Sequence, residues 1–395
     1  MTALLAAACS SPSGGSGGSS GNGSSASINF DAVVDLTGAY GQYGEYDLAG
    51  LKADIAVIND HGGVLGKKLE LHYLDDQSEA SQAYLDAEQL LSQYPATFLD
   101  AGTVTPTCDA ILPVTTRDKV ISFCSGSFPP GKYPYAFGVA PDPSQMAASE
   151  AEALKDLGAT KVALITDAEA GDTAVIADVV SDASHYGLKV VSDATTPVGP
   201  TDYVAQLQQA KSDDAQAILL HSVVPTSVIA LMRDLETLNW TNVKVLVNDE
   251  SVGTDVMENI PAAVSDQFNV VAPRIYLHPK QSSPFASEFV DQLAAEGPIA
   301  DVGISAYHAD AINLAVYAMK TAKTTSNLNA LVNALTSTHS ATIPAGTLLD
   351  FDNPEYSPSE HVLPNSAFTD YWCILRPGTP VQGEYQGETI TVEAP

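Results

Sequence analysis

The chain of 395 residues is long enough for two domains of ordinary size, and its 45% hydrophobic residues can supply a core for each. Its 17 basic and 48 acidic residues give a formal net charge of −31, which repels phosphate backbones and anionic lipid headgroups, so we expect no nucleic-acid partner. Beyond the first few residues no apolar run approaches the roughly 20 residues that cross a bilayer.

Residues 1–27, MTALLAAACSSPSGGSGGSSGNGSSAS, combine a short apolar run, a cysteine and a Gly/Ser tract. Such tracts bury nothing and behave as flexible chain, which indicates a tether. The run from Leu4 to Cys9 resembles a lipobox, although no Lys or Arg precedes it and the run is short. We expect Cys9 to be lipidated at the outer face of the cell membrane and to be the only membrane attachment. An ordinary unstructured N-terminus is the alternative.

From Ile28 onwards, strand-like runs alternate with segments that carry apolar residues at helical spacing. This alternation is typical of parallel sheets with helices on both faces. The runs are, in order, INFDAVVDL, KKLELHYLD, ATFLD, KVISF, KVALITD, LKVVSDA, AQAILLHS, VKVLVN and FNVVAP. The proline-containing segments VAPDPSQ and VAPRIYLHPKQSSP resemble crossovers between two such sets.

The repeated pattern predicts an α/β protein of two doubly wound parallel-sheet lobes, joined by a hinge of three segments, with a cleft between the lobes. We expect residues 28–142 plus 274–342 to form the N-terminal lobe and residues 143–273 plus 343–395 to form the C-terminal lobe. The hinge segments are expected near Pro141 to Pro143, Ala272 to Arg274 and Ile343 to Ala345.

No catalytic signature accompanies this pattern. The candidate serines lie in no G-x-S-x-G elbow, and the glycine-rich phosphate loops of dinucleotide and nucleoside triphosphate enzymes do not occur. None of the eight histidines has a metal-ligand spacing such as H-E-x-x-H, and no C-x-x-C pair is present. We therefore expect a protein that is not an enzyme and has no cofactor and no metal, with an exported hydrolase as the remoter alternative.

Ligands of open parallel sheets bind beyond the carboxyl ends of the strands, where helix N-termini offer unpaired N–H groups. The ends that follow ATFLD and KVISF carry small hydroxyl residues, namely Thr103, Thr105, Thr107, Ser125 and Ser127. Hydroxyl groups at these places suit a ligand carboxylate, and they equally suit helix capping. The sequence leaves both interpretations open for each residue and favours a binding site for the cluster.

Cys108 and Cys124 follow two neighbouring strands, so both are expected at one edge of the sheet. They form either a disulfide, which an exported protein permits, or two buried free thiols. Cys373, inside the apolar run YWCIL, is expected to be a packed small side chain.

The segment LTGAYGQYGEYDLAGLKADIAVINDHGGVLGKKLELHYLDDQSEASQA resembles the opening of the branched-chain amino-acid binding proteins of ABC transporters. The shared features are a T-G-x-x-G turn, a helix that ends in I-N-x-x-G-G, the G-K-K-L-E-L strand entry and the D-D after it. KVALITDAEAGDT and NDESVG continue the match towards the C-terminus. The resemblance implies the type I periplasmic binding fold and an extracytoplasmic receptor that closes on a small amino-acid-like molecule and presents it to an ABC permease. A sensor that docks onto a membrane signalling protein is the alternative.

The same resemblance implies the ligand contacts. It assigns the α-carboxylate contacts to Thr105 and Ser127, an aromatic cleft position to Tyr43, and the ammonium-binding glutamate of NDESVG to Glu250. Asp249 takes this last role if the register shifts by one residue.

Two positions depart from the family. The chain has Ala170, and Val223 or Val224, where the family often has aromatic residues. The side-chain pocket is therefore expected to differ from one that holds a branched-chain amino acid.

Overall fold

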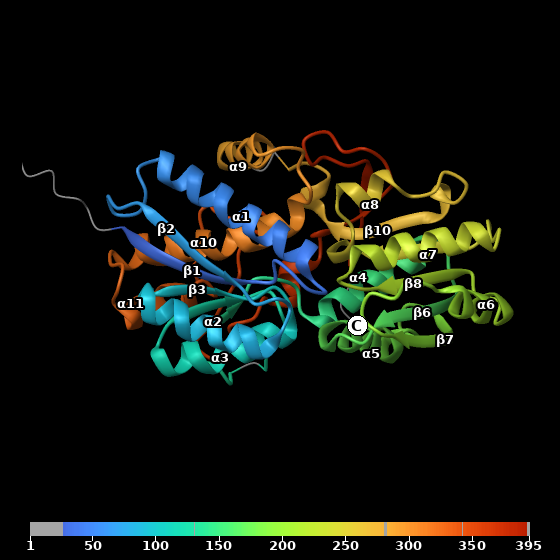
Figure 1. Cartoon of the computed structure of the whole chain (residues 1–395), viewed down its shortest axis with the longest axis horizontal. Helices are drawn as coiled ribbons and strands as arrows, with labels where there is room; N and C mark the ends of the chain where they lie inside the picture. Colours follow the sequence, from blue (N-terminus) through green and yellow to red (C-terminus); the bar gives the residue numbers. More distant parts are fainter. Residues whose placement is uncertain (1–26, 130, 280–282, 342, 393–395) are drawn as a thin grey trace, which may run out of the picture.

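The computed structural model describes residues 27–129, 131–279, 283–341 and 343–392. The predicted lipidation site Cys9 lies outside these residues. In the described part of the chain, two α/β lobes lie side by side along the long axis of the molecule, and each contains one sheet with helices on both faces (Figure 1). This architecture confirms the predicted fold class.

The first sheet has five parallel strands in the order β2-β1-β3-β4-β5. They are β1 (Ile28–Val34), β2 (Leu69–Asp75), β3 (Phe98–Ala101), β4 (Ile121–Cys124) and β5 (Ala136–Gly138). Helices α1 (Gly41–Asp60) and α10 (Val302–Ala322) pack together, as do α2 (Ala80–Gln93) and α3 (Thr105–Asp118). α9 (Pro284–Ala295) contacts α1, and α11 (Leu328–Thr336) contacts α10.

Alternation along the strands explains why helices cover both faces of this sheet. Phe30 and Phe98 belong to the core that includes residues of α1 and α10, whereas Val33 and Leu99 belong to the core that includes residues of α2 and α3. Successive side chains of a strand point to opposite faces, so each strand supplies both cores. The near-continuous apolar runs of the sequence follow from this two-sided burial.

The second sheet has seven strands in the order β12-β11-β10-β9-β8-β6-β7. The parallel strands are β6 (Lys161–Asp167), β7 (Lys189–Thr196), β8 (Ala217–His221), β9 (Lys244–Asn248) and β10 (Phe268–Pro273). β11 (Trp372–Leu375) and β12 (Gly387–Thr389) are antiparallel to their neighbours. The helices are α4 (Pro143–Asp156), α5 (Ala170–Asp182), α6 (Val204–Ser212), α7 (Pro225–Thr237) and the short α8 (Thr254–Glu258).

The two antiparallel strands are a departure from the predicted parallel sheet. Pro273 at the end of β10 lies opposite Trp372 at the start of β11. The chain therefore leaves the second sheet along β10 and returns along β11 at the same end, which requires the two strands to run in opposite directions.

The residues that follow the expected third hinge segment contact α10 of the first lobe. The backbone N–H groups of Leu349 and Asp350 donate to the carboxylate of Asp310 in α10, at 2.7 and 2.9 Å. These residues thus remain bound to the first lobe, beyond the expected hinge segment at Ile343 to Ala345. The lobe boundaries and the three hinge segments remain predictions.

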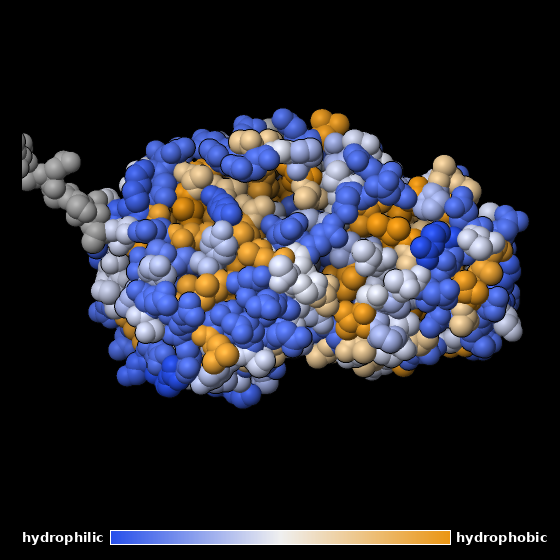
Figure 2. Space-filling model, in the orientation of Figure 1, coloured by the Kyte–Doolittle hydropathy of each residue, from blue (hydrophilic) through white to orange (hydrophobic). Residues whose placement is uncertain are grey.

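The surface is mainly polar. Figure 2 shows hydrophilic residues over most of the face seen in Figure 1, with hydrophobic residues in smaller groups between them. The most exposed large hydrophobic side chains of the described residues are those of Leu65, Leu85 and Val381. No helix among the described residues combines the length and the hydrophobicity that a membrane crossing needs.

Buried carboxyl groups make the stability of this fold depend on pH. Asp301 caps the N-terminus of α10 by accepting from the Ile304 N–H at 2.9 Å, and it also accepts from the Tyr276 hydroxyl at 2.6 Å. Burial nevertheless raises the pKa of Asp301 to about 7. Between its unfolded pKa of about 4 and this value, the folded state binds more protons than the unfolded chain.

We therefore expect the contribution of Asp301 to stability to be complete below about pH 4 and to be lost as the pH rises to about 7. Asp301→Asn keeps an oxygen that caps the helix but removes the titrating group. Its free energy of unfolding should fall less steeply than that of the parent, by at most about 1.4 kcal/mol per pH unit, in urea unfolding measured from pH 4 to pH 7. Parallel curves for the two proteins would contradict this expectation.

Candidate functional site

A small cavity of about 30 Å³ lies between the carboxyl ends of the two sheets. The first lobe contributes the loops that follow β3 and β4, and the second lobe contributes the loops that follow β6, β8 and β9 together with the start of α4. Its lining residues are Thr103, Val104, Thr105, Ser125, Gly126, Ser127, Pro141, Pro143, Met146, Glu169, Gly171, Asp172, Val175, His221, Val223 and Glu250. The cavity therefore lies where a ligand of two parallel sheets is expected.

Hydroxyl groups line the side that belongs to the first lobe. The Thr105 hydroxyl oxygen accepts from the Ser127 backbone N–H at 3.1 Å, and the Ser125 hydroxyl donates to the Thr103 carbonyl at 3.0 Å. Thr105 is the first residue of α3, and no side chain caps this helix. Uncapped helical N–H groups and nearby hydroxyls suit a carboxylate.

Three predicted contacts do not line this cavity. Thr107 is fully buried, where its hydroxyl lies 3.4 Å from Asp35 and donates to the Val104 carbonyl at 3.1 Å. Tyr43, in the first turn of α1, has its side chain buried in the core. Its ring lies edge-on to that of His308, with 6.4 Å between the ring centroids. Ala170 begins α5 with an exposed side chain, although its neighbours Glu169 and Gly171 both line the cavity.

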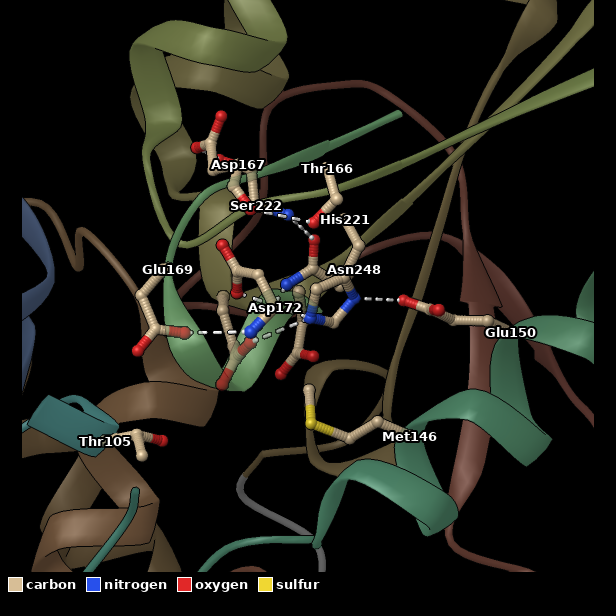
Figure 3. A network of polar contacts seen from close by, with 12 residues as sticks. Thr105, Met146, Glu150, Thr166, Asp167, Glu169, Asp172, His221, Ser222 and Asn248 are labelled. Atoms are coloured by element: carbon tan, nitrogen blue, oxygen red, sulfur yellow. Dashed lines mark hydrogen bonds and ion pairs between the residues drawn. The ribbon is translucent and has the colours of Figure 1, made fainter. Parts of the chain in front are cut away.

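A histidine with four nearby carboxyl groups forms the side that belongs to the second lobe (Figure 3). His221 Nδ1 lies 2.5 Å from Glu150 Oε1, while its Nε2 lies 3.5 Å from Asp172 Oδ1 and 3.9 Å from Glu250 Oε2. Glu169 caps α5 by accepting from the Asp172 backbone N–H at 2.8 Å. The side chains of Glu150, Asp172 and His221 are at most 2% exposed, and that of Glu250 is 16% exposed.

Burial and mutual repulsion shift the ionisation of these groups. Burial alone would lower the pKa of His221, but Glu150, Asp172 and Glu250 outweigh this effect and raise it to about 10. Burial raises the pKa of Glu250 to about 7 and that of Asp172 well above its ordinary value. No Lys or Arg is among the described residues that line the cavity. This side therefore favours a positively charged group.

Sequence reasoning missed most of this acidic side. Glu169 and Asp172 belong to the AEAGDT segment that follows a predicted strand, and His221 ends another predicted strand. Their position at the carboxyl ends of parallel strands could have identified them as candidate site residues. Glu150 carried none, because it meets His221 across 71 residues of sequence.

The structure also qualifies the expectation of no metal. Two groups, Asp172 with His221 and Glu250, and Asp47 with Asp100 and His308, place three ligand-type atoms within 4.8 Å of one another. Because the members of each group come from different helices, strands or loops, spacing along the sequence does not reveal them.

Residues 27–355 match the family model described as periplasmic binding protein. The chain belongs to the periplasmic binding protein family. This is a family of binding proteins, and its members work outside the cytoplasm. A comparison with curated proteins finds no match.

Solved structures of such proteins share the fold. The leucine-binding protein LivK of Thermotoga maritima is 19% identical, with a TM-score of 0.75 over 92% of this chain and 99% of that one. LivJ of Streptococcus pneumoniae, in complex with isoleucine, is 19% identical, with a TM-score of 0.75 over 93% of this chain and 100% of that one. A solute-binding protein of an ABC transporter from Rhodopseudomonas palustris, in complex with 3,4-dihydroxybenzoic acid, is 17% identical, with a TM-score of 0.75 over 93% and 99%.

These comparisons confirm the family and the type I fold that the sequence motifs indicated. The ligands printed for the two complexes differ in chemistry, one being an amino acid and the other an aromatic acid. The fold alone therefore does not identify the ligand of this periplasmic binding protein.

The cysteines of the first lobe lie beside the hydroxyl-lined side of the cavity. Cys108 in the first turn of α3 and Cys124 at the end of β4 are joined by a disulfide, with their Cα atoms 6.1 Å apart. Cys373 is a buried free thiol. The disulfide ties the start of α3 to the loop that carries Ser125 and Ser127.

Removing this bond should therefore affect both stability and the cavity. For the double variant Cys108→Ser, Cys124→Ser, we expect the free energy of unfolding to fall by about 3 kcal/mol, because the unfolded chain regains the entropy of the closed loop. Guanidinium unfolding measures this loss, and mass spectrometry of unreduced peptides checks the bond. Separately alkylated cysteines in the parent protein would contradict the pairing.

Proposed function

We propose that the protein is an extracytoplasmic solute-binding protein of an ABC transporter, anchored to the outer face of the cell membrane by a lipid on Cys9. It captures a small amino-acid-like solute in the cavity between its lobes and delivers it to an ABC permease. The observation that carries the proposal is the polarity of the cavity, which has hydroxyl groups on one wall and carboxyl groups on the other.

The two walls suit the two ends of an amino acid. Thr105, Ser127 and the uncapped N-terminus of α3 offer donors for a carboxylate. On the opposite wall Glu250 faces the cavity, and Asn248 donates to it at 3.0 Å. The α-ammonium group is the simplest positively charged partner for Glu250, because it supplies up to three hydrogen bonds.

The surroundings of the neighbouring acid support this assignment. Asp249 is fully buried, lies outside the cavity lining and accepts from the Tyr307 hydroxyl at 3.1 Å. A ligand would have to displace the Tyr307 hydroxyl to reach it. Glu250 is thus the favoured contact of the pair.

Glu250→Gln should weaken the binding of an amine-bearing solute by tens to thousands of fold, because truncating one partner of a buried charged pair costs about 2–5 kcal/mol. A thermal-shift screen of amino acids identifies the solute, and titration calorimetry then measures the loss. Glu236→Gln, on the exposed side of α7, is the matched control and should bind as the parent does. Equal affinity of the Glu250 variant and the parent would refute the role of Glu250.

The anchor has its own test. Cys9→Ser removes the thiol that would carry the lipid, so we expect the variant to leave the membrane fraction and to appear in the medium or the periplasm. Immunoblots of membrane and soluble fractions measure the shift, and Ser11→Ala serves as the control. A Cys9→Ser protein that stays in the membrane fraction would exclude this anchor.

A further inference from the structure

The acidic wall of the cavity has the arrangement of a metal-binding site. Its three potential ligand atoms are His221 Nε2, Asp172 Oδ1 and Glu250 Oε2, and they lie within 4.8 Å of one another. A tetrahedral zinc ion with bonds of about 2.0–2.1 Å separates its ligand atoms by roughly 3.3–3.5 Å. The distances of 3.5 and 3.9 Å from His221 Nε2 are close to this separation, so a small closing movement would complete the geometry.

Glu150 orients the imidazole for this role. It lies 2.5 Å from His221 Nδ1, and it is itself buried in α4. A bound ion displaces the Nε2 proton of the His221 imidazolium. With Nδ1–H donating to Glu150, the lone pair of Nε2 then faces Asp172 and Glu250. A carboxylate behind the non-ligating nitrogen is a common second partner of metal-bound histidines.

A buried oxygen without a hydrogen-bond partner points to a missing ligand. The Asp172 side chain is 2% exposed, and its Oδ2 has no hydrogen-bond partner. An unsatisfied buried carboxylate oxygen is unfavourable, and a bound cation would offset that cost. The arrangement of Glu150, His221 and Asp172 is seen together in Figure 3.

We propose that the cavity binds a divalent transition-metal ion, with Zn²⁺ as the representative, on Asp172, His221 and Glu250. An imidazole with two carboxylates suits zinc-like ions, whereas Ca²⁺ and Mg²⁺ prefer oxygen ligands alone. Three protein ligands leave one coordination position open towards the cavity.

This inference rests on the proposed function, since the solute would occupy the same cavity. A small amino acid that has lost its ammonium proton to solvent chelates such an ion through its amino nitrogen and one carboxylate oxygen, which makes the ion five-coordinate. The ion then replaces the α-ammonium group as the positive charge that Glu250 meets, and the solute is captured as a metal chelate.

The first experiment uses the full chain after dialysis against EDTA and titrates it with ZnCl₂ alone in a calorimeter. We expect one ion per cavity, and Ca²⁺ binding at least about 100-fold weaker. His221→Gln and Asp172→Asn should each reduce Zn²⁺ affinity by at least about 100-fold. Glu150→Gln, which removes a positioning residue, should reduce it by about 10–100-fold when measured at a temperature at which the variant is folded.

Two controls separate this site from other histidines. His185→Gln replaces an exposed histidine, and Asp47→Asn disrupts the second group of ligand-type atoms, so both variants should keep Zn²⁺ binding in the cavity. The visible spectrum of the Co²⁺-loaded parent provides a readout that does not require any variant to fold. No Zn²⁺ binding by the parent, or full affinity in a folded His221→Gln protein, would overturn the proposal.

A second titration distinguishes the metal from the receptor function. If amino acids bind only when Zn²⁺ is present, both proposals hold. If they bind equally well to the EDTA-treated protein, the ammonium group is the partner of Glu250, and capture of the solute as a metal chelate is refuted while the receptor function stands. If Zn²⁺ binds and no amino acid does so with or without it, the metal site stands and the proposed solute class fails.

Discussion

The ion pair between Glu150 and His221 joins the two elements that shape the second wall of the cavity. Glu150 lies in α4, the first helix after the chain passes from the first lobe, and His221 ends β8 in the middle of the second sheet. Both side chains are 1% exposed, so the pair is shielded from the bulk solvent. Removing either partner would leave a buried charge, which typically costs about 3–5 kcal/mol. The orientation of Asp172 and Glu250 around the imidazole depends on this pair.

Because basic residues are scarce, few buried carboxyl groups of this protein have a positively charged partner such as His221. With 17 basic against 48 acidic residues, most buried carboxyl groups have no cationic side chain to meet. Some are held by other donors: Asp310 accepts from the backbone N–H groups of Leu349 and Asp350, and Asp167 accepts from the hydroxyl groups of Ser222 and Thr196. His221 is therefore the main source of positive charge on the acidic wall.

The sequence predicted the regular part of the fold because apolar strands and amphipathic helices produce recognisable patterns of hydrophobic residues within a short stretch of sequence. All nine strand-like runs became strands, including the four-residue β3 and β4, but β5, β11 and β12 were missed. These three short strands lie outside the regular alternation of strands and helices by which the others were identified. The antiparallel direction of β11 depends on where the chain returns, which no local pattern encodes.

The site was predicted to the extent that it follows strand ends. Thr105, Ser125, Ser127, Val223 and Glu250 line the cavity because each comes directly after a strand of the two sheets or begins the next helix. Tyr43 and Thr107 occupy similar places in the sequence, but the helical turn directs their side chains into the core. The Glu150–His221 contact could not be inferred, since it depends on the packing of a helix against a distant strand.

The hydrogen bonds between the three passages have a mechanical consequence. The Gly138 N–H, at the end of β5, donates to the His361 carbonyl at 2.8 Å, and the Arg274 N–H, after β10, donates to the Tyr371 carbonyl at 2.7 Å. The third segment that connects the lobes thus lies between the other two and is hydrogen-bonded to both. Three separate chains would permit twisting and sliding in any direction, but chains linked edge to edge form a single ribbon, which bends easily across its width and resists shear along its length. These hydrogen bonds therefore favour rotation of the lobes about one axis over sliding of one lobe past the other.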